Sequence, residues 1–243
     1  MAERLAFEID PGGGPKSPSP RASSAVAYPA AGGAHADATL VLAHGAGAPQ
    51  QSGFMVGFAN GLADRGVDVL TFNFLYTEQR RRVPDRTDAL EACYRAAIGV
   101  ARRHFGRDTV FIGGKSMGGR IATHLAAADD AGALGIAGVV LLGYPLHPPG
   151  KPDQPRTAHL PRILVRLLIV QGERDPFGTP DELRRVVATL DTDVTLRLIP
   201  NGDHSLAPSR RADAVAAVYS QLQDEIAVWI AGAPRCGGAL PRG

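Results

Sequence analysis

The stretch "TVFIGGKSMGGRIATHLA" (residues 109–126) joins a short apolar run to a segment of helical composition through a glycine-rich turn. Two interpretations of this turn compete. Gly114-Lys115-Ser116 looks like the end of a phosphate-binding P-loop. Gly114, Ser116 and Gly118 instead form G-x-S-x-G, the sharp strand-to-helix turn that presents a nucleophilic serine. The residues around the turn decide between them.

A P-loop requires G-x-x-x-x-G-K-S/T, because its backbone N–H groups must wrap the phosphates before the helix begins. The position five residues before Gly114 is Thr109, and residues 109–112 have the composition of a strand interior. Only Gly113 and Gly114 remain to form a loop, which is too short to hold a phosphate. We therefore reject nucleotide binding and favour the turn that presents Ser116.

Apolar runs of strand length alternate with longer segments of helical periodicity. The runs are near-continuous rather than alternating, as expected of strands covered on both faces. They occupy residues 39–45, 67–74, 109–114, 138–145, 166–172 and 194–200, and helices are predicted over 86–104, 181–190 and 209–231. This order predicts an α/β fold with a mostly parallel, doubly wound sheet and right-handed helical crossovers. Functional residues in such sheets gather at the carboxyl ends of the strands.

The regular pattern defines one domain, which we expect over residues 39–231. Residues 1–38 precede it as an N-terminal edge strand ("RLAFEI", 4–9) and a segment dense in Gly, Pro, Ser and Ala (11–34). That segment buries too little apolar surface to offset its ordering entropy, which predicts that part of it is a flexible loop. We expect residues 232–243 to form a flexible tail.

A serine hydroxyl needs a base to take its proton and an acid to hold the base in the correct tautomer. On a fold that presents its nucleophile on such a strand-to-helix turn, the three residues occur along the chain in the order Ser, Asp or Glu, His. His204, in "LRLIPNGDHSL", is the only histidine beyond residue 160, and it lies just after the last predicted strand. His204 is therefore the predicted base.

The acid is expected in "RLLIVQGERDPFGTPDEL", the strand and turn that precede His204. Asp175 is the first choice and Glu173 the second. Asp181 is expected to cap the following helix. Asp203, the neighbour of His204, should point elsewhere if His204 faces Ser116.

The developing oxyanion needs hydrogen-bond donors. One is predicted to be the backbone N–H of Met117, directly after the nucleophile. The loop "LAHGAGAP" (42–49) follows an early strand, and its small residues allow close approach of the backbone. We assign the second donor to Ala46, with Gly45 and Gly47 as the next choices. His44 is expected to brace this loop by hydrogen bonding.

Composition excludes several other classes of protein. The net charge of +2 is too small to indicate nucleic acid or an anionic membrane as a partner, and no apolar run is long enough to span a bilayer. Two cysteines, Cys93 and Cys236, form no disulfide framework, which favours a reducing cytoplasm. The remaining histidines match no zinc spacing, so neither a metal nor a cofactor is expected.

The motifs "LAHGAGAP", "GGKSMGGRIA", "QGERDPFG" and "GDHSL", in this order, resemble those of the α/β-hydrolase superfamily. The likeness is to its dienelactone-hydrolase-like branch, which includes NSL-complex-subunit-like proteins. The resemblance implies a triad of Ser116, Asp175 and His204. Dienelactone hydrolases use a cysteine nucleophile, so their substrate is not implied.

The leading hypothesis is a serine hydrolase that cleaves a small-molecule ester, thioester or amide through an acyl-enzyme. The alternative is a catalytically idle binding or scaffolding module on the same fold. Residues 146–162 are rich in proline and too short for a large cap domain. An open, shallow site that prefers short acyl chains is therefore expected, whereas the sequence makes no prediction of oligomeric state.

Overall fold

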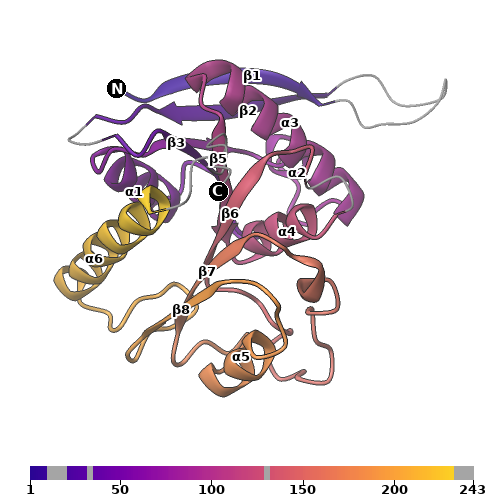
Figure 1. Ribbon diagram of the computed structural model, residues 1–243, viewed down its shortest axis with the longest axis vertical. Helices are drawn as coiled ribbons and strands as arrows, with labels where there is room; N and C mark the ends of the chain where they lie inside the picture. The colour runs from indigo at the N-terminus through magenta and orange to yellow at the C-terminus, as the bar shows by residue number, and fades with distance from the viewer. Residues whose placement is uncertain (10–20, 32–34, 129–131, 233–243) are drawn as a thin grey trace, which may run out of the picture.

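A computed structural model of the chain describes residues 1–9, 21–31, 35–128 and 132–232. Within them an eight-stranded sheet runs through the centre of the molecule in the order β1-β2-β4-β3-β5-β6-β7-β8 (Figure 1). β1 and β2 are antiparallel, and all later strands are parallel to one another. The strands are β1 (Glu3–Ile9), β2 (Arg21–Tyr28), β3 (Ala38–Ala43), β4 (Asp68–Phe72), β5 (Thr109–Lys115), β6 (Ile136–Leu142), β7 (Arg166–Gly172) and β8 (Val194–Ile199).

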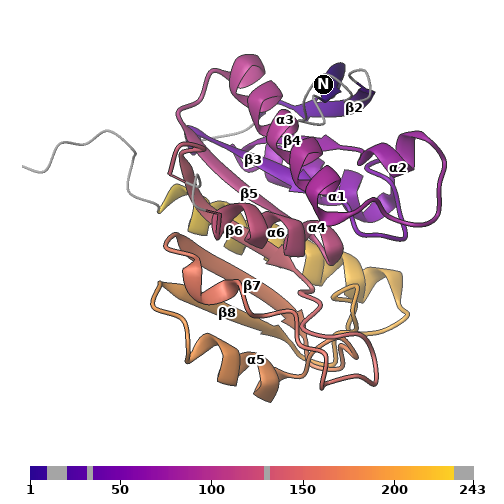
Figure 2. The same ribbon diagram turned by 90° about the vertical axis from the view of Figure 1, so that its right-hand side faces the viewer.

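Helices cover both faces of the sheet, as predicted for a doubly wound fold. α1 (Gly53–Ala63) and α6 (Ala212–Ala231) lie on one face, and α3 (Thr87–Phe105), α4 (Met117–Ala126) and α5 (Pro180–Val187) lie on the other (Figures 1 and 2). The short α2 (Leu75–Glu78) follows β4. Two apolar cores result, one on each side of the sheet.

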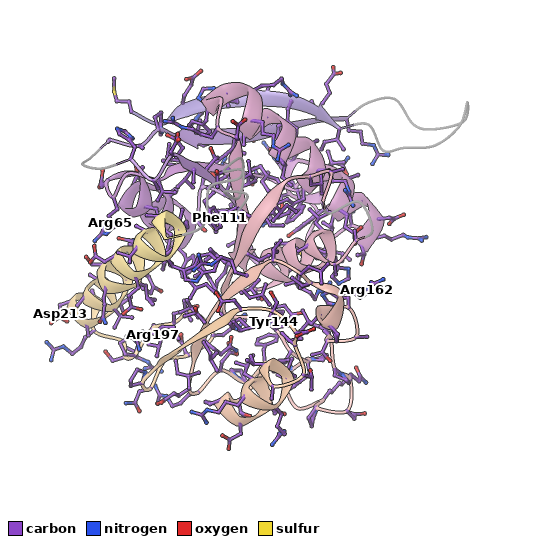
Figure 3. The ribbon with its side chains drawn as sticks, viewed as in Figure 1. Arg65, Phe111, Tyr144, Arg162, Arg197 and Asp213 are labelled. Atoms are coloured by element: carbon purple, nitrogen blue, oxygen red, sulfur yellow. The ribbon has the colours of Figure 1, made fainter. Side chains whose placement is uncertain are left out.

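The near-continuous apolar runs become the central strands because both of their faces are buried. Every residue of β3 and β4 is buried, so alternation of polar and apolar residues is absent there. Phe111 of β5 lies near the middle of the molecule (Figure 3), and its ring centroid is 5.5 Å from that of Trp229 on α6. Ile112, its neighbour, packs into the core on the opposite face.

The N-terminal segment differs from its prediction. No strand is predicted within residues 11–34, part of which is expected to be a flexible loop, but residues 21–28 form β2, which lies between β1 and β4. The prediction failed because "RASSAVAY" is rich in small residues, and its strand conformation depends on non-local pairing with both neighbours. Residues 10–20 and the tail 233–243 lie outside the described residues.

The β6–β7 connection contains no cap domain, as predicted. Its only helical element is a single 3-10 turn, η1 (Leu160–Arg162). The predicted cap of α5 was wrong by two residues. Thr179, rather than Asp181, is the N-cap, and it forms a capping box with Glu182 while Pro180 occupies the first helical turn.

No helix in the described part of the chain is long and apolar enough to cross a membrane.

Candidate active site

Ser116 lies on the turn between β5 and α4, at the carboxyl edge of the sheet. Its φ of 51° and ψ of −114° place a residue with a side chain in a conformation that glycine normally occupies. The Ser116 N–H donates to the carbonyl of Leu142, and its own carbonyl accepts from the N–H of Arg120 in the first turn of α4. These bonds hold the turn against β6 on one side and the helix on the other.

The glycines on either side of Ser116 are required by close backbone packing. A Cβ at Gly114 would lie 2.5 Å from the carbonyl oxygen of Ala43, and one at Gly118 would lie 2.4 Å from the same atom. Backbone atoms cannot yield as a flexible side chain can. The G-x-S-x-G pattern therefore reflects the contact of α4 with the end of β3.

The structure brings the three predicted triad residues together. His204, on the loop between β8 and α6, places its Nε2 atom 2.9 Å from the Ser116 Oγ atom. Its Nδ1 atom lies 2.7 Å from the Asp175 Oδ2 atom. A continuous chain of hydrogen bonds thus links a hydroxyl, an imidazole and a carboxylate that come from three different loops.

Asp175 is buried and has further partners of its own. Its Oδ1 atom accepts from the N–H of Phe177 at 2.9 Å, and its Oδ2 atom accepts from Nε2 of Gln171 at 2.9 Å. Glu173, the alternative acid, is exposed and accepts from the N–H of Asn201 instead. The geometry therefore favours Asp175 as the partner of His204.

Side chains of the histidine loop and of β5 hold His204 from several directions. The Oδ1 atom of Asp203 accepts from the N–H groups of Ser205 and Ala207, at 2.7 and 3.0 Å. Asp203 thus points away from Ser116 and stabilises the loop itself. The Nζ atom of Lys115 donates to the His204 carbonyl. Burial lowers the pKa of Lys115 to about 8, although Asp175 and Asp203 oppose this shift.

Several supporting residues were not predicted. Gln171, fully buried at the end of β7, contacts both Asp175 and the backbone of Tyr144. The ring of Phe177 stacks on His204 with centroids 4.2 Å apart. Lys115 stood in the motif, directly before Ser116, but its role depends on a loop 89 residues away in the sequence.

The predicted oxyanion donors, Ala46 and Met117, both line the cavity at Ser116. His44 braces the Ala46 loop, as expected. Its Nδ1 atom lies 2.7 Å from the carbonyl of Gly45, and its Nε2 atom accepts from the N–H of Phe74 at 3.2 Å. Burial lowers the pKa of His44, which favours the neutral ring that this arrangement requires.

The cavity has a volume of about 590 Å³, which is within the range of small-molecule sites. Apolar groups form much of its wall, including Phe54, Met55, Leu90, Met117, Pro145 and Phe177. Lys115, Arg120 and Arg156 also line it. In the described ranges, no cluster of three or more His, Cys, Asp or Glu side chains could bind a metal ion.

Residues 36–231 match the model of a protein family described as alpha/beta hydrolase domain. The match covers the whole sheet from β3 to β8 and the helices between these strands. It includes Ser116, Asp175 and His204.

Solved structures of similar fold include several hydrolases. A serine hydrolase without a lid from Xanthomonas campestris is 21% identical, with a TM-score of 0.65 over 93% of this chain and 95% of that one. Dienelactone hydrolase from Anabaena variabilis is 20% identical, with a TM-score of 0.67 over 92% and 96%. A cold-adapted esterase from an Arctic intertidal metagenomic library is 18% identical, with a TM-score of 0.62 over 91% and 93%.

Proposed function

Because the chain belongs to the alpha/beta hydrolase family, we propose that it is a serine hydrolase that cleaves a carboxylic ester, or a thioester or amide, through an acyl-enzyme. The catalytic residues in this proposal are Ser116, His204 and Asp175. One observation supports it above all others: the hydrogen-bond chain from Ser116 Oγ through His204 to Asp175, with distances of 2.9 and 2.7 Å.

In the first half of the reaction, the Ser116 oxygen attacks the substrate carbonyl carbon as its proton passes to His204 Nε2. The carbonyl oxygen becomes negatively charged and accepts hydrogen bonds from the N–H groups of Ala46 and Met117. Asp175 accepts a hydrogen bond from the Nδ1–H group of His204 and stays ionised, which leaves Nε2 free to act as the base. His204 then gives its proton to the leaving alcohol, which departs and leaves an acyl group on Ser116.

In the second half, water takes the place of the leaving alcohol. His204 removes a proton from the water, the resulting hydroxide attacks the acyl carbon, and the same oxyanion donors stabilise the second tetrahedral intermediate. Its collapse releases the carboxylic acid and returns the proton to Ser116. Gln171 and Phe177 take no part in proton transfer, but their hydrogen bonds to Asp175 keep the carboxylate aimed at His204.

The preferred substrates in this proposal are small or extended acyl compounds. The β6–β7 connection provides no cap domain to enclose a long lipid chain. A cavity of about 590 Å³ holds a small ester in contact with its walls. A strong preference for long-chain over short-chain p-nitrophenyl esters would contradict this part of the proposal.

The alternative, an idle binding or scaffolding module, predicts a broken triad or a filled pocket. The hydrogen-bonded triad and the cavity in front of Ser116 both favour the enzyme instead. The two hypotheses also differ in reactivity toward a fluorophosphonate probe, which forms a covalent bond only with an activated serine.

The test compares wild type with Ser116→Ala. The folded wild-type protein should react with the fluorophosphonate at Ser116 and hydrolyse short p-nitrophenyl esters, and both activities should vanish in Ser116→Ala. The expected loss in kcat is about 10⁴-fold or more, because removal of a nucleophile disables the whole triad. Circular dichroism confirms that the variant is folded. Absence of both labelling and hydrolysis in folded wild type would refute the proposal.

A further inference from the structure

We propose that Arg120 and Arg156 form an anion-binding subsite beside Ser116, so that the substrate is an ester that carries a carboxylate. This inference rests on the proposed hydrolase function and adds a substrate class to it. Both arginines line the same cavity as Ser116 and His204.

The two arginines come from different elements that converge on the cavity. Arg120 lies on α4, one helical turn after Ser116, and its N–H donates to the Ser116 carbonyl. Arg156 lies in the β6–β7 connection. Its backbone is held in place, because its N–H donates to the carbonyl of Leu146 at 2.7 Å and its carbonyl accepts from the hydroxyl of Tyr144 at 2.8 Å.

Neither guanidinium forms an ion pair or a hydrogen bond within the described part of the chain. Partly buried arginines elsewhere do have acidic partners. Arg107, for example, pairs with Asp68 at 2.8 Å, and Arg65 pairs with Asp224 at 2.6 Å. A partly buried guanidinium without a counter-charge is costly, since it has lost water without gaining an acceptor.

The third cation in the cavity, Lys115, already donates to the His204 carbonyl and is therefore occupied. Asp85 is the only carboxylate among the described residues that line the cavity, and it pairs with Arg81 and accepts from the N–H of Tyr76. The cavity thus has an excess of positive charge that no acidic side chain neutralises.

No carboxylate is among the groups that shift the pKa of Arg120, so its surroundings do not offset this excess. Burial lowers the pKa of Arg120, and repulsion from Arg156 lowers it further. Burial and the charges of Arg120 and Arg162 lower the pKa values of His124 and His159, so neither ring adds positive charge near neutral pH, and Glu91 contacts His124 at 3.2 Å. Arg162 itself is exposed on η1 (Figure 3). A bound anion would relieve the repulsion between the two cavity arginines.

A carboxylate suits this pair because its two oxygens accept from the planar guanidinium in a bidentate arrangement. With the ester carbonyl at Ser116, a carboxylate elsewhere on the same small molecule would reach the arginines within one cavity. A phosphate has similar hydrogen-bonding chemistry, and the experiment therefore includes both groups.

The first arm compares matched esters on wild type. On the acyl side, p-nitrophenyl monoadipate is compared with p-nitrophenyl hexanoate. On the alcohol side, 4-acetoxybenzoate and 4-acetoxyphenyl phosphate are compared with neutral 4-acetoxybenzamide. We expect kcat/KM to be roughly ten- to hundredfold higher for the carboxylate in at least one pair, as is typical of a charge-assisted hydrogen bond. A phosphate that outperforms both carboxylates would contradict the assigned class, and equal rates in every pair would overturn the subsite.

The second arm tests the arginines. Arg120→Gln and Arg156→Gln should each lower the ratio of kcat/KM for the anionic ester to kcat/KM for the neutral ester by about tenfold or more. Arg162→Gln is the matched control, because it removes the same charge nearby but outside the cavity lining. An equal effect of all three substitutions would indicate a long-range electrostatic effect of positive charge instead of a specific subsite, and it would overturn the proposal.

A third arm separates this inference from the proposed function. Binding of 4-acetoxybenzoate to Ser116→Ala is measured by calorimetry, with and without Arg120→Gln. Loss of binding in the double variant supports the subsite even if turnover fails. If the wild type hydrolysed neutral esters but showed no preference for anionic ones, the proposed hydrolase function would stand and the anion-binding subsite would be refuted.

Discussion

The turn that carries Ser116 and the loop that carries His204 belong to the same site but are held in place by different means. The serine turn is fixed by backbone packing, because α4 touches the end of β3 where Gly114 and Gly118 leave no room for a side chain. The histidine loop is packed as closely where it leaves β8, since a Cβ at Gly172 would lie 2.3 Å from the Asp203 carbonyl oxygen, but beyond that point polar contacts from Asp203, Lys115 and Tyr219 hold it. We therefore expect a single added methyl group to disrupt the serine turn, whereas loss of any one of these polar contacts should weaken the histidine loop only in part.

The largest effect is expected from Gly118→Ala. Its Cβ would meet the carbonyl oxygens of Ala43 and His44 at 2.4 and 2.7 Å, so the helix must shift away from the strand. We expect a loss of about 3 kcal/mol in the free energy of unfolding and a loss of at least about 100-fold in kcat/KM. Urea unfolding and ester hydrolysis measure the two effects.

Gly57→Ala on α1 is the matched control, since a Cβ there meets nothing within 4 Å. It should raise the free energy of unfolding by about 0.5–1 kcal/mol, as alanine favours a helix. If Gly118→Ala behaved like Gly57→Ala, the serine turn would not be packed as tightly as its glycines indicate.

Lys115 lies next to Ser116 and donates to the His204 carbonyl, so it links the two regions. Lys115→Met should change how the free energy of unfolding depends on pH. The folded state releases the Lys115 proton at about pH 8, whereas an unfolded lysine keeps it to about pH 10.5. Because the unfolded state binds more protons in this window, the free energy of unfolding of wild type should rise with pH relative to Lys115→Met. The expected gain is about 3 kcal/mol across the window, measured by urea unfolding at a series of pH values.

Other groups that titrate at high pH are present in both proteins and cancel in the difference. A constant difference between wild type and Lys115→Met from pH 8 to 10.5 would mean that the ammonium is not desolvated where the structure places it.

Asp203→Ala should have a moderate effect confined to the histidine loop. It removes the acceptor of the Ser205 and Ala207 N–H groups, so His204 loses its fixed position relative to Ser116. We expect kcat to fall about tenfold with little change in KM, because the loss concerns alignment rather than substrate contact. Asp203→Asn keeps an acceptor oxygen and should restore most of the activity, and failure of this rescue would argue against the proposed role.

The smallest effect is expected from Tyr219→Phe. The Tyr219 hydroxyl donates to the carbonyl of Ser205 at 2.7 Å in an exposed position. Removal of one such bond should cost about 0.5–1 kcal/mol of unfolding free energy and reduce kcat by about twofold, as measured by thermal unfolding and ester hydrolysis. A loss as large as that of Asp203→Ala would show that the loop responds cooperatively instead of bond by bond.

The parallel part of the sheet could be predicted because its strands are buried on both faces and therefore stand out as apolar runs. The positions of Ser116, Asp175 and His204 followed from the order of the motifs and from the rule that sites gather at the carboxyl ends of strands. The choice between Asp175 and Glu173 was harder. The two lie in one turn, and the folded structure distinguishes them by the burial of Asp175 and by its contacts with His204 and Gln171.

Features that depend on distant partners could not be predicted. β2 owes its conformation to pairing with β1 and β4, not to its small residues. The pairing of Lys115 with the His204 carbonyl, and the approach of Arg120 to Arg156, require loops far apart in sequence to meet. No spacing in the sequence carries that information.

The positive φ of Ser116 has a consequence for evolution and engineering. A serine in this conformation is strained, whereas a glycine is not. Ser116→Gly should therefore raise the free energy of unfolding by about 1 kcal/mol, while the protein loses the hydroxyl. A selection for heat resistance alone would therefore favour loss of this proposed nucleophile. Stability and the proposed activity thus place opposite demands on residue 116, and only a selection for activity keeps the serine there.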